Sequence, residues 1–141
     1  MRRAMFTAFD EFIPTGANSA SPVFTSTELN SRLAQFDQFA LQLIVDNVNG
    51  SPTGGLDLYI EHSADGRNFV PVKTGAASPP ASGAGDVAFP APLSATSTNV
   101  KWGAHDGNEP LLGYVRFRIF FSNAVTSAHV RVLVTQRDRG N

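Results

Sequence analysis

The sequence predicts an all-β protein: a single antiparallel β-sandwich or jelly-roll domain of about eight or nine strands with an extended N-terminal arm. Apolar and polar residues alternate with a period of two in several segments, turn-forming Gly, Pro, Asn and Asp cluster between them, and helical periodicity is weak. Short strands separated by turns are typical of sandwiches and jelly rolls. The 141 residues fit one domain, with residues 1–35 as the arm and first edge strands and residues 36–141 as the core.

Four segments show the alternation clearly, with large apolar residues at every second position, as half-buried strands do. They are residues 39–45, 56–62, 114–121 and 128–136. Weaker strand candidates are residues 5–12, 22–26, 68–73, 86–90 and 98–102. The best helical signal lies at residues 26–33, where a Ser or Thr cap supports one short turn at most.

The segments between these strands differ in character. Residues 49–55, NGSPTGG, are rich in turn formers and predict a hairpin between the first two clear strands. Ser63-Ala64-Asp65-Gly66 interrupts an alternating run, and Asp-Gly between strands indicates the bend of a hairpin rather than a binding loop. Residues 74–86 and 103–113 predict a long flexible loop and a second irregular loop.

Composition excludes several classes of function. With 11 basic and 12 acidic residues the net charge is −1, which gives no global attraction to nucleic acid or to an anionic membrane. The absence of cysteine excludes disulfides, thiolate nucleophiles and cysteine-based zinc sites. No stretch has the length of a membrane span, and Asp10 and Glu11 interrupt what a signal peptide would need. We therefore expect a protein made in the cytoplasm without a signal peptide, with no membrane contact.

The histidines do not predict a catalytic or metal site. His62, His105 and His129 are scattered along the chain, and no GxSxG, HExxH, P-loop or GxGxxG motif is present. The stretch AHDGNE, residues 104–109, holds a histidine and two carboxylates, but its spacing fits a solvated turn better than a metal site. We expect no enzymatic activity, no cofactor and no metal.

Arginines on the last two clear strands form the main charged feature. If these strands pair as a hairpin around residues 122–127, Arg116, Arg118 and Arg131 share a face and need a neutralising partner. An acidic residue of a neighbouring strand, Asp57, Glu61 or Asp46, ranks first as that partner. An acidic surface of another subunit ranks second, and a phosphate or nucleic acid ranks third.

The N-terminal segment carries apolar side chains that would be costly to leave exposed. Pro14 and Gly16 limit the length of any strand there, so the segment is an edge strand or an arm that docks on a neighbouring subunit. As an arm it would bury apolar area between subunits or add a strand to them. The expected assembly contacts are Phe6, Phe9, Phe12 and Ile13.

Two stretches carry a family resemblance. The stretch IEHSADGRNF, residues 60–69, resembles the strand–SxDGxxF–strand hairpin of discoidin-like sandwiches, which recurs in small β-sandwich proteins of phage virions such as head-decoration and tail-associated subunits. The stretch GYVRFRI, residues 113–119, resembles the strand that accompanies this hairpin. The resemblance covers about a third of the chain and implies a sandwich fold in a virion.

These observations predict a non-enzymatic assembly protein: a virion capsid or head-decoration subunit, or a similar self-associating shell or filament protein. Its partners would be copies of itself or a capsid lattice, in a virion or another extracellular assembly. The alternative is a discoidin-like carbohydrate-binding module, for which Trp102 and Tyr59 are the only aromatic candidates for a sugar platform. A third alternative, an enzyme on a jelly roll, lacks the clustered histidines that a cupin-type metal site needs.

Overall fold

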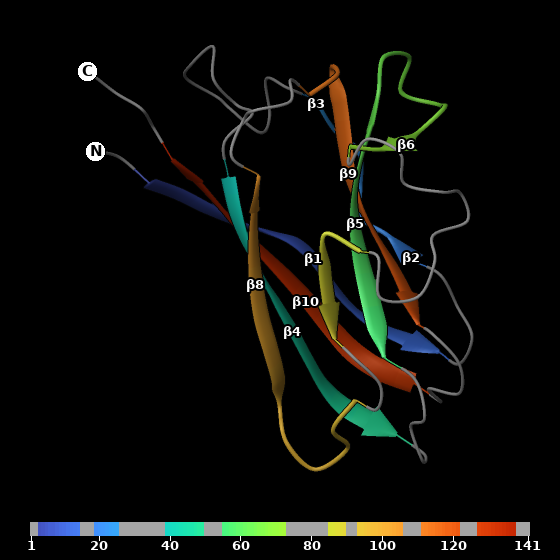
Figure 1. Cartoon of the computed structure of the whole chain (residues 1–141), viewed down its shortest axis with the longest axis vertical. Coiled ribbons are helices and arrows are strands. Elements are labelled where there is room, and N and C mark those ends of the chain that lie inside the picture. Colours follow the sequence, from blue (N-terminus) through green and yellow to red (C-terminus); the bar gives the residue numbers. More distant parts are fainter. Residues whose placement is uncertain are drawn as a thin grey trace.

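The computed structural model describes residues 3–14, 19–25, 39–49, 55–72, 85–89, 93–105, 111–121 and 127–137, and every helix or strand assigned among them is a strand (Figure 1). The ten strands are β1 (Arg3–Pro14), β2 (Ser19–Ala20), β3 (Phe24–Thr25), β4 (Phe39–Asn49), β5 (Leu56–Ser63), β6 (Val70–Pro71), β7 (Val87–Phe89), β8 (Asn99–His105), β9 (Tyr114–Phe121) and β10 (Ser127–Arg137). The all-β prediction is confirmed.

The strands form two antiparallel sheets, which agrees with the predicted sandwich. Sheet A has the order β1-β10-β4-β8 (Figure 1). Sheet B has the order β2-β9-β5-β6, and the short strands β3 and β7 extend it by pairing with β9 and β5. β2 and β3 thus lie one after the other along β9 at one edge of sheet B, and β6 and β7 do the same along β5 at the other edge. Each sheet is therefore four strands wide.

The pairing is nested along the chain. β1 pairs with β10, β2 and β3 pair with β9, β4 pairs with β8, and β5 pairs with β6 and β7. Each strand from β1 to β5 therefore pairs with at least one strand from β6 to β10. The first and last strands lie side by side, with Arg3 opposite Arg137.

The core lies between the inward faces of the two sheets. Sheet A contributes alternate residues of its two central strands, including Leu43 and Val132, which are fully buried. Sheet B contributes Phe117, whose ring meets the Phe39 ring of sheet A edge-on with centroids 5.9 Å apart. This contact joins the sheets directly, because an edge-to-face pair adds directional attraction to the burial of apolar area.

Two β-bulges adjust which residues face this core. In β1 the register shifts between Thr7 and Phe9, so that Phe6 and Phe9, three residues apart, lie on the same side. In β4 Asn47 adopts a positive φ of 49°, a conformation that Asn tolerates better than most residues. The bulge there buries both Val45 and Val48.

The hairpin predicted at residues 49–55 is wrong, and the hairpin considered around residues 122–127 does not form either. The segments 39–45 and 56–62 do form β4 and β5, but β4 lies in sheet A and β5 in sheet B. The segments 114–121 and 128–136 form β9 and β10, which also lie in different sheets. Alternation reveals that a segment is half-buried but not which strand it pairs with, and a turn-rich connection can cross between sheets as readily as it can close a hairpin.

Of the two alternatives for the N-terminal segment, an edge strand or a free arm, the structure has the edge strand. β1 pairs with β10 from Arg3 to Pro14. Phe9 and Ile13 are buried in the chain's own core, and Phe6 packs against it with its ring 5.4 Å from that of Phe24. The proposal that Phe9 and Ile13 are assembly contacts is therefore corrected, since a side chain in the core cannot reach a neighbour. Phe12 alone of the four is exposed.

Several predicted features lie outside the described residues: the helical turn at 26–33, most of the loop at 74–86, and residues 106–110 of the loop at 103–113. Within the second loop, Gly103 and His105 belong to β8. A Cβ added to Gly103 would lie 2.5 Å from Cγ2 of the buried Val87. The missing side chain at Gly103 thus lets β8 approach β7 and close one side of the sandwich.

Replacing Gly103 with Ala should therefore destabilise the protein by about 1–3 kcal/mol, the usual cost of overpacking a core. Val87 is β-branched and buried, so it cannot simply rotate away. Gly113→Ala is the matched control, because a Cβ there meets nothing within 4 Å. Urea denaturation of both variants measures the difference, and equal stabilities would contradict the close approach of β8 to β7.

Candidate functional site

The outer face of sheet A, defined as the side chains of its four strands that point away from sheet B, is the candidate functional surface. The registers place these residues in four cross-strand rows. Read from β1 to β8, the rows are Met5, Thr135, Ala40, Ala104; then Thr7, Leu133, Gln42, Trp102; then Asp10, Arg131, Ile44, Val100; and finally Phe12, His129, Asp46.

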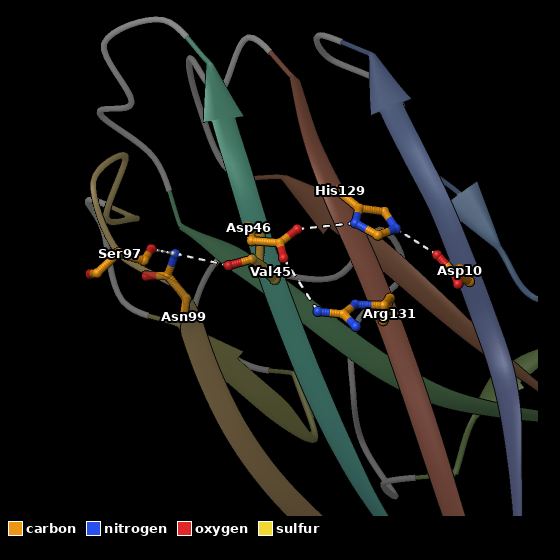
Figure 2. A network of polar contacts seen from close by, with 7 residues as sticks. All are labelled: Asp10, Val45, Asp46, Ser97, Asn99, His129 and Arg131. Carbon is orange, nitrogen blue, oxygen red and sulfur yellow. Dashed lines mark hydrogen bonds and ion pairs between the residues drawn. The ribbon is translucent and has the colours of Figure 1, made fainter.

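A polar network occupies one end of this face (Figure 2). His129 on β10 lies between two carboxylates: its Nδ1 is 3.0 Å from Oδ1 of Asp46 on β4, and its Nε2 is 2.5 Å from Oδ1 of Asp10 on β1. Arg131 donates from Nη2 to Oδ2 of Asp46 at 3.3 Å. The network therefore ties three neighbouring strands together through their side chains.

Local chain geometry explains why these groups meet. The bulge in β1 turns Asp10 to the outer side after Phe9 has turned inward, and Asp46 directly precedes the bulge residue Asn47. A protonated imidazole can donate to both carboxylates, whereas the neutral ring has one N–H to donate. Both ring nitrogens of His129 already face carboxylates. The side chain is therefore positioned to link β10 to β1 and β4 and not to act as a general base.

A second polar cluster fixes β8 at the margin of the same face (Figure 2). Nδ2 of Asn99 donates to the Val45 carbonyl of β4 at 3.2 Å and to the Ser94 carbonyl at 3.0 Å. The Ser94 backbone N–H donates back to Oδ1 of Asn99 at 3.0 Å. These bonds order the loop before β8 and hold the start of that strand against β4.

Exposed apolar side chains gather on the outer face of sheet A. Among the described residues seven large apolar side chains are exposed, and four of them lie on this face. Val100 and Trp102 stand on β8, and Met5 and Phe12 on β1; Trp102 is 73% exposed. The exposed apolar side chains thus form two groups, one at each margin of this sheet face.

The Asp65-Gly66 stretch is the bend of a hairpin, since β5 pairs with β6 across it. Oδ1 of Asp65 accepts the backbone N–H groups of Arg67 and Asn68, both at 2.8 Å, and Gly66 has a φ of 73°. These N–H donors hold the pKa of Asp65 well below its usual range. The carboxylate is used within the turn, so the hairpin interpretation of this stretch is supported.

The predicted arginine face is divided between the two sheets. Arg116 and Arg118 stand on β9 in sheet B, whereas Arg131 stands on β10 in sheet A, so Arg118 does not lie beside Arg131. Glu61 on β5 lies 2.8 Å from Nε of Arg116 and 3.6 Å from Nη1 of Arg118. All three arginines thus have an acidic partner in the chain itself, the source ranked first from the sequence.

The side chains of β5 that point away from sheet A are buried. Several of them are polar, and their alternation with apolar residues would predict that solvent covers them. Asp57, Tyr59 and Glu61 are each less than 5% exposed. Burial, together with the Asp57 and Asp86 carboxylates, raises the pKa of Tyr59 to about 12. Asp86, which directly precedes β7, also accepts the Ile60 backbone N–H at 2.7 Å, in the gap along β5 between the residues that pair with β7 and those that pair with β6.

The remaining sequence candidates do not form a catalytic constellation among the described residues. Nδ1 of His62 accepts the Leu112 backbone N–H at 3.1 Å, and Tyr59 is too buried to serve as a sugar platform. Where side chains are described, no group of three His, Asp or Glu residues has the geometry to hold a metal ion. None of the described segments is a helix long and apolar enough to cross a bilayer.

Comparison with known proteins found no matching protein-family model and no matching curated protein. The proposed function therefore depends on the geometry of the chain itself.

Neutralising Glu61 should lower the free energy of unfolding by about 1–3 kcal/mol, because two arginines then stand together on one strand face without their buried carboxylate. The variant is Glu61→Gln. Its matched control is Glu11→Gln, because Glu11 is exposed and its Oε2 accepts the Ser19 hydroxyl at 3.4 Å; the expected change is within about 0.5 kcal/mol. Chemical denaturation that gives both variants the same stability would contradict the role of Glu61.

Replacing Tyr59 with Phe should change how stability depends on alkaline pH. The folded state holds the phenol neutral, with its pKa raised from 10.0 to about 12, so its contribution is complete below pH 10 and is lost as the pH rises through 12. Wild-type protein should therefore lose more stability between pH 10 and 12 than Tyr59→Phe. Urea titrations across this range test it; parallel curves for the two proteins would rule it out.

Proposed function

We propose that the chain is a non-enzymatic structural subunit of a self-assembling shell or filament, such as a virion capsid or head-decoration protein. The observation that carries this proposal is the outer face of sheet A, where exposed apolar side chains flank an internally paired polar network. Such a face can be buried against another protein without leaving the Asp46 carboxylate unpaired, because His129 and Arg131 already contact its two oxygens.

The strand order supports the same proposal. Nested pairing of first strand with last, and so on inward, in two sheets of four positions supports a jelly-roll form of the sandwich. Jelly rolls serve as capsid and lectin domains, and this analogy of fold favours an assembly role. His62 and His129 are engaged in structural contacts, which favours a non-enzymatic use of the fold.

The arginines favour protein contacts over nucleic acid. Arg116, Arg118 and Arg131 each pair with a carboxylate of the chain, and the net charge is −1. A surface that binds nucleic acid gains affinity from unpaired cations that release counterions. The partner that fits this chain is another copy of itself or a neutral protein lattice, in an assembly built from subunits made in the cytoplasm.

Carbohydrate binding is the second candidate, and Trp102 is the observation that favours it. The indole is 73% exposed on the outer face of sheet A, with Gln42 next to it in the same row. An exposed Trp can stack on a sugar ring, while a neighbouring amide supplies hydrogen bonds. Tyr59, the other aromatic candidate, is 1% exposed and cannot contribute to such a platform.

Purified protein should form defined oligomers, particles or filaments, because burial of the exposed apolar face favours association. Light scattering over a range of concentrations, with negative-stain images of the same samples, measures this. A chain that remains monomeric throughout contradicts self-assembly. If that monomer also binds a glycan array, and Trp102→Ala abolishes the binding, the carbohydrate-binding function is correct instead.

A further inference from the structure

We infer that two copies of the chain associate through the outer faces of their sheets A, about a two-fold axis that runs along the strands between β10 and β4. This inference rests on the proposed self-assembly and specifies its contact surface. Closed two-fold pairs are the commonest oligomers of soluble proteins, and they require one surface that is complementary to itself.

The size of the face is sufficient for a specific contact. Four strands about 4.8 Å apart, with four rows spanning about eight residues at about 3.3 Å each, cover roughly 500 Å² of one copy. Two such faces bury roughly 1,000 Å² in total, the lower limit for a specific protein interface. The four exposed apolar residues at its margins supply the hydrophobic part of that area.

The edges of sheet A are less suited to pairing than its face. The β1 edge carries a bulge after Thr7, the charged pair Asp10 and Glu11, and Pro14 at its end, which are features that oppose edge-to-edge association. On the β8 side, Nζ of Lys101 donates to the Ala88 carbonyl of β7 at 2.6 Å, so β7 lies against that strand. Strand addition at either edge is therefore disfavoured.

The sizes of the facing side chains set the orientation of the axis. An axis along the strands keeps each row in place and exchanges β10 with β4. The same operation places β8 over β1, and the large Trp102 then faces the short Thr7. An axis across the strands would instead set Trp102 over Val100, with two projecting side chains at the same margin.

The first test is a pair of charge insertions at exposed apolar positions. Trp102→Glu should weaken dimer formation at least tenfold, measured by analytical ultracentrifugation of the full-length chain. Val70→Glu is the matched control, because Val70 is 52% exposed but stands on β6 in sheet B, and dimerisation should be unchanged. Circular dichroism checks that both variants fold. Equal dimerisation by Trp102→Glu and wild-type protein overturns the inference.

The absence of native cysteine allows a second test of the axis. Thr7→Cys and Ala104→Cys are both exposed on this face, at opposite margins. A short bismaleimide should cross-link a mixture of the two variants but neither variant alone. Cross-linking of Thr7→Cys with itself indicates the axis across the strands and overturns the inferred orientation.

The two proposals fail in different ways. Oligomers that persist in Trp102→Glu, with no cross-link in the mixture, overturn this interface and leave self-assembly standing. A wild-type chain that sediments as a monomer at every concentration overturns the proposed function itself, and this inference with it.

Discussion

Strand β10 is the element on which the rest of the structure depends. It pairs with β1 on one side and β4 on the other, and its inward valines, Val130, Val132 and Val134, are fully buried. Its outward residues His129 and Arg131 bind carboxylates on both neighbours. One strand therefore holds the first strand, the fourth strand and the core together, so that folding of sheet A requires the end of the chain to meet its beginning.

The sequence predicted the strands well and their partners poorly. Period-two alternation reports that one face of a segment is buried, which is why the segments at 39–45, 56–62, 114–121 and 128–136 all appear as strands. It carries no information about which strand lies alongside. The two-residue strand β2 is too short to show any period, and the bulge at Asn47 is set by backbone conformation rather than by hydrophobic pattern.

Buried polar residues explain why the candidate site was only partly predictable. Asp57, Tyr59 and Glu61 alternate with apolar residues as a solvated face would, yet they are buried with Asp86 and Arg116 among their partners. The acidic partners proposed from the sequence for the arginines included Glu61 and Asp46, both of which the structure uses. Because like charges on a strand face require compensation, this part of the electrostatics could be predicted without knowing the strand order.

Trp102 could not be assigned from the sequence, because a single Trp in a short strand is compatible with the core, with a sugar platform and with an interface. Its exposed position on β8 excludes the core. The positions of the other exposed apolar residues favour an interface over a sugar platform. A sugar platform needs one aromatic surface with polar groups around it. Here Met5 and Phe12 stand at the opposite margin, about three strand spacings away, which is roughly 14 Å at about 4.8 Å per spacing. A small sugar at Trp102 would leave that margin exposed, whereas a second copy of the sheet covers both margins at once.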